Sequence, residues 1–162
     1  METNASQARF DCDVLIAGSG ASGMAAAVTA AAYGLKVIVA EKEARFGGTT
    51  ARSGGWLWIP RTRLATDQGI DEPVGAARTY LKHETATHFD PARVDAFLES
   101  GPKAIDFFTT RTCLQFDLSP TFPDYHAEAP GGQLGGRSMI TGRSMDVSWA
   151  RASNNSLRRC PS

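Results

Sequence analysis

The chain has 162 residues, 42% of them hydrophobic, and its 17 basic and 17 acidic side chains give a formal net charge of zero. This length allows one domain with a hydrophobic core, and the composition is that of an ordinary globular protein. The balanced charge gives no reason to expect a nucleic-acid partner.

Residues 1–13 contain no apolar segment of the kind found in a secretory signal, so we expect a cytoplasmic protein. Residues 21–40 form the longest weakly polar run, but they are mostly alanine, which gains little from lipid, and no membrane span is expected. Cys12, Cys113 and Cys160 lack metal-ligand spacing, so we expect no metal site.

The segment from residue 13 to residue 41 is predicted to form a strand, a turn, a helix and a second strand. Residues 13–17 and 36–40 are short and apolar, as strands buried in a parallel sheet are. The alanine-rich run 25–32 favours a helix, and Gly34 is suited to end it. The sequence therefore predicts an α/β fold whose first two strands are parallel neighbours.

Three glycines, Gly18, Gly20 and Gly23, form a G-x-G-x-x-G pattern at the start of this helix. Gly18 permits a tight turn, Gly20 removes a side chain where pyrophosphate approaches the backbone, and Gly23 lets the helix pack close to the strand. Ala21 and Ser22 lie at the helix N-terminus, whose N–H groups and partial positive charge attract phosphate. The pattern in this position predicts a dinucleotide site.

Glu41 ends the second predicted strand, about 20 residues beyond the glycines, where a carboxylate can accept hydrogen bonds from both ribose hydroxyls. The acid would repel a ribose that carries a 2′-phosphate. Lys42, the next residue, is a further candidate contact of the cofactor. A glycine-rich turn in an unrelated α/β protein is the alternative, but it leaves Glu41 unexplained.

A second glycine-rich segment covers residues 46–55, where small residues expose backbone N–H groups. It suits a loop folded along an extended cofactor, whereas an NAD-binding domain usually continues into another strand and helix. A flexible surface loop is the alternative, although the bulky Trp56, Trp58 and Ile59 argue against disorder. The candidate cofactor contacts in this segment are Gly47, Gly48, Thr49, Thr50, Ala51, Ser53, Gly54 and Gly55.

Two further helices are predicted from proline-containing start signals. The first begins at residues 71–73 and runs through Leu81, and the second begins at residues 90–91. We expect residues 101–102, Gly-Pro, to interrupt the second helix. Residues 122–138 contain six glycines and prolines and are predicted to form an irregular loop of the kind that often carries function.

Together these segments resemble the flavoprotein family of fumarate reductase, succinate dehydrogenase and 3-ketosteroid dehydrogenases, from Asp13 to about Gly142. The resemblance implies a Rossmann-like FAD-binding domain with a parallel sheet, incomplete at its C-terminus. It places Glu41 at the adenosine ribose, residues 47–51 along the diphosphate and ribityl chain, and residues 53–55 near the isoalloxazine ring. Members that attach flavin covalently use a histidine where this chain has Gly48, so we expect non-covalent FAD.

The same resemblance implies a role for Tyr125, because the 3-ketosteroid dehydrogenases have a similar D-Y-[HY]-x-E-x-P-G-G segment. There the tyrosine lies at the substrate pocket; a surface aromatic in a proline-rich turn is the alternative. The implied activity is dehydrogenation of a carbon–carbon bond next to a carbonyl in a steroid-like or dicarboxylate substrate. A catalytically silent fragment and a small NAD-binding module remain as alternatives.

The resemblance stops after residues 136–138, and a reading-frame slip near Gly142 would explain this. Read with each codon's third base joined to the next two, Met145–Asp146 and Trp149–Ala150 must both encode glycine. These glycines fit a Pro-Phe-Asp-Gly-Arg-Glu-Leu-Gly segment of the family. We therefore expect residues 1–142 to be the N-terminal part of an FAD-binding domain and residues 143–162 to be a non-native, poorly ordered tail.

Overall fold

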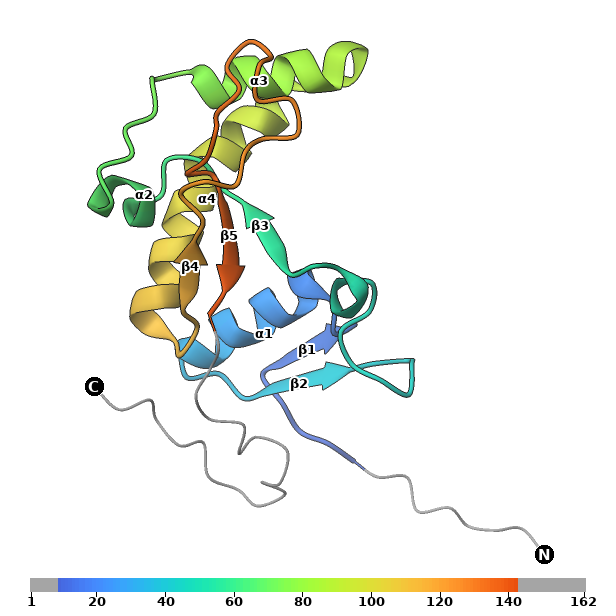
Figure 1. Cartoon of the computed structure of the whole chain (residues 1–162). Helices are drawn as coiled ribbons and strands as arrows, with labels where there is room; N and C mark the ends of the chain where they lie inside the picture. Colours follow the sequence, from blue (N-terminus) through green and yellow to red (C-terminus); the bar gives the residue numbers. More distant parts are fainter. Residues whose placement is uncertain (1–8, 143–162) are drawn as a thin grey trace, which may run out of the picture. The chain divides into compact units, whose positions relative to one another are not determined.

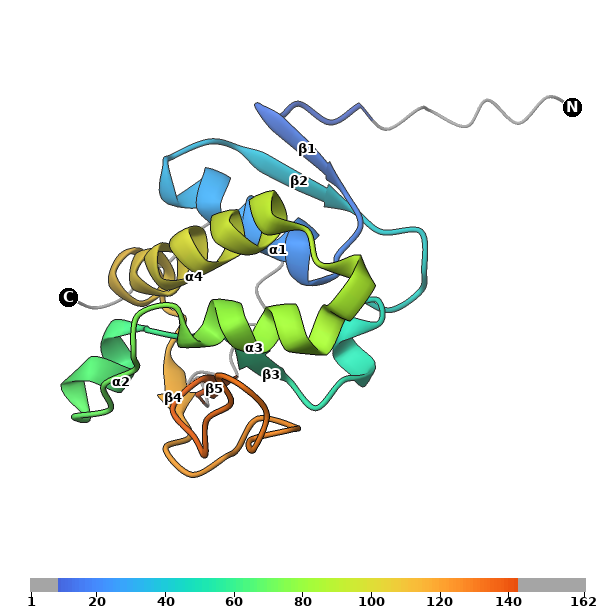
Figure 2. The same cartoon turned by 90° about the horizontal axis from the view of Figure 1, so that it is seen from above.

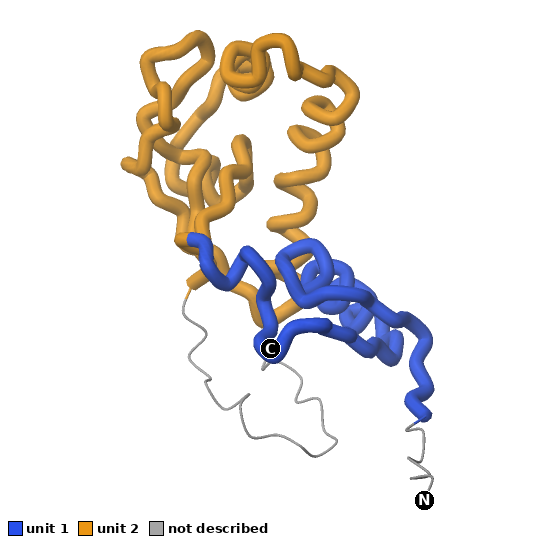
Figure 3. Tube along the Cα trace, turned by 90° about the vertical axis from the view of Figure 1, so that its right-hand side faces the viewer, with its two compact units in different colours: residues 1–53 blue, residues 54–162 orange. Residues whose placement is uncertain are grey.

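The computed structural model of the protein describes residues 9–142, so the expectation for residues 143–162 lies outside the described residues. The chain divides into two compact units (Figure 3), an N-terminal unit, Met1–Ser53, and a C-terminal unit, Gly54–Ser162. Each unit is described by itself.

The N-terminal unit is a parallel strand pair joined by a helix (Figure 1). Strand β1, Val14–Ala17, pairs with β2, Val37–Ala40, in a register that sets Val14 beside Val37. Helix α1, Ala21–Ala32, connects the two strands and packs against both. The predicted α/β arrangement is confirmed. Both strands end where predicted, at Ala17 and Ala40, and each begins one residue later than predicted.

The end of α1 shows why this short crossover forms. Gly34 has φ of +85°, and its N–H donates to the Ala31 carbonyl at 2.9 Å. The N–H of Leu35 donates to the Ala30 carbonyl at 3.2 Å. This pair of bonds satisfies carbonyls that the helix leaves open, and the left-handed residue between them turns the chain toward β2.

The C-terminal unit combines a small antiparallel sheet with helices. The strand order in this sheet is β3–β5–β4, with Trp56 opposite Ile140 and Phe116 opposite Thr141. Ile105 of the longest helix packs with Phe116 and Met139 in a buried cluster that fixes this helix on the sheet. The elements are β3, Trp56–Trp58; α2, Arg63–Asp67; α3, Ala76–Thr85; α4, Pro91–Arg111; β4, Phe116–Leu118; and β5, Ser138–Thr141. Two short 3-10 turns are η1, Thr50–Arg52, in the first unit and η2, Ala86–His88, in the second.

The structure corrects two helix predictions. Helix α3 begins at Ala76 after Gly75, rather than at residues 71–73. Helix α4 begins at Pro91 as predicted, with the Asp90 carboxylate accepting the Arg93 N–H at 3.2 Å. The predicted interruption at residues 101–102 is wrong, because α4 continues to Arg111.

Gly101 and Pro102 serve packing within a continuous helix. A Cβ on Gly101 would lie 2.9 Å from Cγ2 of Ile59, so glycine lets α4 approach the segment after β3. A proline costs a helix one hydrogen bond, but contacts on both sides hold this helix together. Phe97 before it stacks against Trp58, and Ile105 after it is buried in the core. Helix α3 runs beside α4 (Figure 2). Within residues 9–142, no helix combines the length and the apolar character needed to cross a membrane.

Candidate cofactor site and aromatic pocket

The three glycines of the turn after β1 have different surroundings, as the sequence predicts. Gly18 has φ of +95°, which glycine adopts readily, and its N–H donates to the Ala40 carbonyl at 2.7 Å. A Cβ on Gly23 would overlap the Gly18 carbonyl, so this glycine allows the helix to pack on the strand. A Cβ on Gly20 would meet nothing nearer than Oγ1 of Thr50 at 3.9 Å. Among the described residues, a Cβ on Gly18 would also meet nothing within 4 Å, so the turn leaves open backbone surface at Gly18 and Gly20 that a diphosphate could approach.

Glu41 is held at the end of β2 by three hydrogen bonds. Its Oε2 accepts from Ser19 twice, from the N–H at 2.9 Å and from the hydroxyl at 2.5 Å. Its Oε1 accepts from the Glu43 N–H at 3.0 Å. These bonds, the Ser19 hydroxyl first, lower the pKa of Glu41 from 4.5 to about 2. The carboxylate is therefore ionised at neutral pH and is a fixed hydrogen-bond acceptor beside the glycine turn.

The second glycine segment folds back on this turn instead of forming a free surface loop. The Gly47 N–H donates to the Ser19 hydroxyl at 2.8 Å. The Ala21 N–H, at the start of α1, donates to Oγ1 of Thr50 at 3.1 Å. A Cβ on Gly48 would lie 3.7 Å from Cα of Gly20, so two glycine backbones face each other across the site. Two segments that are separated in sequence thus form one cradle.

The remaining predicted contacts are less closely tied to this cradle. Ser22, Thr49 and Ala51 are exposed, and Lys42 forms an exposed ion pair with Glu43 at 3.6 Å. Ser53 ends the N-terminal unit, and its hydroxyl donates to the Thr50 carbonyl at 2.8 Å. Gly54 and Gly55 belong to the C-terminal unit, where Gly55 precedes β3 with φ of +76°.

Ser19 is a site residue that sequence reasoning missed. Its side chain is buried and joins Glu41 to the Gly47 loop. The serine occupies a variable position of the glycine pattern, so the pattern itself gives no signal for it. With Met24, Val39, Phe46 and Gly47, it lines a cavity of about 530 Å³ in the N-terminal unit.

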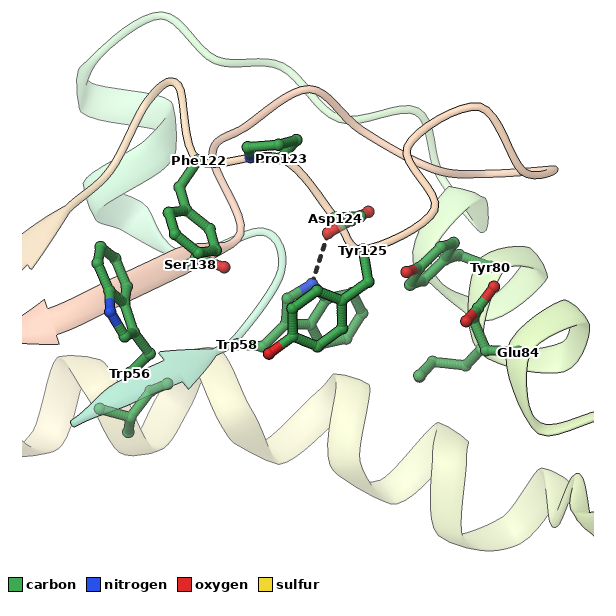
Figure 4. Close-up of a pocket in the computed structure, with 11 residues that line it drawn as sticks. Trp56, Trp58, Tyr80, Glu84, Phe122, Pro123, Asp124, Tyr125 and Ser138 are labelled. Atoms are coloured by element: carbon green, nitrogen blue, oxygen red, sulfur yellow. Dashed lines mark hydrogen bonds between the residues drawn. The ribbon is translucent and has the colours of Figure 1, made fainter. Parts of the chain in front are cut away.

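A second cavity, of about 340 Å³, lies in the C-terminal unit and is lined by aromatic side chains (Figure 4). The rings of Trp56 and Phe122 stack with centroids 4.5 Å apart. Trp58 and Tyr80 lie deeper, with ring centroids 6.0 Å apart. Tyr125 lines the same cavity but is 92% exposed, so it stands at the rim rather than within the wall.

The pocket wall rests on a buried ion cluster. The Arg137 guanidinium donates to Asp124 and to Glu72, each at 2.6 Å, and its side chain is 1% exposed. Asp124 also accepts the Trp58 indole N–H at 2.7 Å, the contact dashed in Figure 4. The guanidinium lies 5.4 Å from the Trp58 ring centroid and 5.6 Å from that of Tyr80. Arg137 therefore fixes both the wall and the loop that carries Tyr125.

A histidine beside Tyr125 anchors the same loop to α3. Nδ1 of His126 and Oε2 of Glu84 lie 2.7 Å apart, and Glu84 also contacts His83 at 3.2 Å. The hydrogen bond to Glu84 raises the pKa of His126 and, from the other side, lowers the pKa of Glu84. Residues 9–142 hold no cluster of His, Cys, Asp and Glu side chains placed to bind a metal ion.

Comparison with known proteins identifies the family. Residues 13–157 match the family described as FAD binding domain. The chain is 47% identical over 129 residues to a 4-oxocyclohex-2-ene-1-carboxylate 5-dehydrogenase of Sinomonas cyclohexanicum, covering 80% of this chain and 22% of that protein. It is 45% identical over 127 residues to a 3-oxosteroid 1-dehydrogenase of Mycobacterium tuberculosis, covering 78% of this chain and 23% of that protein.

Solved structures agree with this assignment. The fold matches a 3-ketosteroid Δ1-dehydrogenase of Sterolibacterium denitrificans with a TM-score of 0.72 and 38% identity, over 81% of this chain and 23% of that one. The chain thus spans less than a quarter of the length of these relatives. The resemblance predicted from the glycine segments is confirmed, and FAD rather than NAD is the cofactor. The chain belongs to the FAD-binding domain family of flavoproteins.

Proposed function

We propose that the chain is the nucleotide-binding part of an FAD-dependent oxidoreductase that dehydrogenates a carbon–carbon bond next to a carbonyl. The observation that carries this proposal is the ionised Glu41 carboxylate fixed beside the open backbone of Gly20. The two relatives support the reaction class, because the name of each describes dehydrogenation of an oxo compound.

Each part of the cradle has a task toward FAD. Gly20 and Gly48 provide backbone surface without side chains for the diphosphate, while Glu41 accepts from the adenosine ribose. We propose non-covalent binding, since Gly48 stands where the covalently flavinylated members have histidine. Bound FAD supplies the hydride acceptor.

Tyr125 is the proposed substrate-side residue. Its phenol stands at the rim of an aromatic cavity, where it can donate a hydrogen bond to a substrate carbonyl or support a base supplied by another part of the protein. A ring ketone suits this cavity better than a dicarboxylate, because most of the lining side chains are aromatic or apolar and its two carboxyl side chains, Glu84 and Asp124, would repel a dianion. The cytoplasmic location and the lack of a nucleic-acid partner stay expectations from the sequence.

The test is FAD binding by the purified chain and by the variants Glu41→Arg and Glu43→Arg. We expect the wild type to show flavin absorbance and to bind FAD in a fluorescence titration. Glu41→Arg should lose this binding, or prefer a ribose with a 2′-phosphate, because a cation replaces the acceptor. Glu43→Arg makes the same charge change at an exposed neighbour and should bind as the wild type does.

Two outcomes would count against the proposal. A wild-type chain that takes up no FAD would favour a catalytically silent fragment. Equal FAD affinity in the wild type and in Glu41→Arg would remove Glu41 as the ribose ligand.

A further inference from the structure

We propose that Ser19 is a positioning residue of the nucleotide site, which holds Glu41 so that the chain reads only one hydroxyl of the adenosine ribose. This inference rests on the proposed FAD binding. It concerns two contacts of the Ser19 hydroxyl and the number of acceptor positions that they leave on the carboxylate.

The direction of both hydroxyl contacts is fixed by chemistry. The Gly47 N–H can only donate, so at 2.8 Å the Ser19 oxygen accepts from it. Oε2 of the ionised Glu41 can only accept, so at 2.5 Å the single hydroxyl proton points to the carboxylate. Ser19 is buried, with 2% of its surface exposed, and water therefore does not compete for these bonds. The hydroxyl couples the acid at the end of β2 to the second glycine segment.

The carboxylate has about four acceptor positions, two on each oxygen. The Ser19 N–H and hydroxyl occupy both positions on Oε2. The Glu43 N–H occupies one position on Oε1 at 3.0 Å. Within the described part of the chain, these hydrogen bonds leave one position on Oε1 for a ligand. The sequence predicts that Glu41 accepts both ribose hydroxyls. With these contacts in place, the bound sugar offers two donors and the fixed carboxylate has room for one.

The first experiment measures which ribose hydroxyls matter. FAD and its two analogues that lack the 2′- or the 3′-hydroxyl of the adenosine ribose are titrated against the full chain. One analogue should bind as FAD does, while the other should bind on the order of tenfold to a hundredfold more weakly, the loss typical of one hydrogen bond to a charged group. Similar losses with both analogues would overturn the single-hydroxyl reading.

The second experiment tests Ser19 directly and does not need the cofactor. Amide hydrogen exchange of Gly47 is followed in the wild type, in Ser19→Ala and in Ser19→Thr, with Ser100→Ala on the exposed face of α4 as the matched control. Ser19→Ala should speed exchange at Gly47, because its acceptor is removed, whereas Ser19→Thr keeps a hydroxyl and should restore protection. Ser100→Ala should leave this amide unchanged.

The two experiments distinguish a failure of the proposed FAD binding from a failure of the proposed role of Ser19. If the wild type binds no FAD, the proposed function falls, and the exchange data still decide whether Ser19 couples the two segments. If FAD binds but Ser19→Ala keeps both its FAD affinity and the Gly47 protection, Ser19 has no positioning role. In Ser19→Ala the freed carboxylate should also lose part of its discrimination between the two deoxy analogues, an effect that general destabilisation would not produce.

Discussion

Two glycines of the first turn are expected to have different roles: Gly23 in packing and Gly20 in cofactor binding. Gly23→Ala forces a Cβ against the Gly18 carbonyl, and neither backbone can move freely. We expect a loss in the free energy of unfolding of about 1–3 kcal/mol, the usual range for overpacking. Gly20→Ala meets open space, so its stability should stay within about 0.5 kcal/mol of the wild type while FAD affinity falls. Urea unfolding and FAD titration of both variants check this; a Gly23→Ala chain as stable as the wild type would contradict it.

Arg137 gives a second prediction at the scale of one residue. Arg137→Met leaves the carboxylates of Asp124 and Glu72 buried without a cation. Breaking such a buried pair typically costs about 3–5 kcal/mol. Arg111→Met removes an exposed arginine from the end of α4 and should change stability by less than about 0.5 kcal/mol. Urea unfolding of the two variants measures both losses in stability. Equal losses would mean that the buried ion cluster does not stabilise the fold more than an exposed arginine does.

The positions of some residues in the fold could be predicted from the sequence, and those of others could not. Gly18, Gly23 and Glu41 are defined by their spacing, because a turn, a close helix and a strand end are local features. Ser19 and Arg137 act through partners far along the chain. A serine inside a glycine pattern or an arginine after Gly-Gly has no periodic signal that reveals such a partner.

At the scale of elements, the loop that carries Tyr125 is fastened to α3 by a pH-dependent pair. Folding raises the pKa of His126 through its hydrogen bond to Glu84, and Glu128 adds to this shift. A group whose folded pKa is raised stabilises the fold fully below its unfolded value, about 6.5 for histidine, and loses that contribution as pH rises through the folded pKa. Glu84, whose pKa is lowered, loses its contribution only as pH falls below its ordinary range.

His126→Gln should therefore be less stable than the wild type at about pH 6, and the difference should shrink at about pH 9. Tyr80 and His83 also face this pair, so the same pH series on His83→Gln serves as the control. Urea unfolding at both pH values measures the differences. A constant difference for His126→Gln across this range would show that the charge on the imidazole does not matter.

Element prediction succeeded where contacts are local. The β1–α1–β2 crossover joins neighbours in sequence, and its glycine turn and glycine helix end are both readable. The sheet of the C-terminal unit pairs β3 with β5 from the far end of the unit, through strands of three and four residues. Such short strands carry too little alternation to be recognised, and their pairing depends on the whole intervening chain. The wrong break in α4 has the same origin, because contacts on either side outweigh the local preference of Gly-Pro.

At the scale of the whole molecule, cofactor binding and turnover should separate. The chain contains the proposed nucleotide cradle, but it spans only 22% and 23% of the length of the two dehydrogenases. Within residues 9–142, Tyr125 is 92% exposed and has no enclosing wall that would hold a substrate carbonyl at a fixed distance. Catalysis by positioning needs such a wall, and a water-filled rim weakens the electrostatic contacts that polarise a carbonyl.

We therefore expect the purified chain with added FAD to give no steroid-dependent dye reduction near normal enzyme rates, roughly 1 per second or faster. The assay is a dye-reduction time course with a 3-ketosteroid, run beside FAD titration of the same sample. Tyr125→Phe should leave both readings unchanged, because an exposed phenol contributes neither to the cradle nor to a closed pocket. The prediction would be contradicted by turnover at enzymatic rates that is lost in Tyr125→Phe. The reaction would then depend on the Tyr125 hydroxyl, and the chain alone would already form a working substrate site.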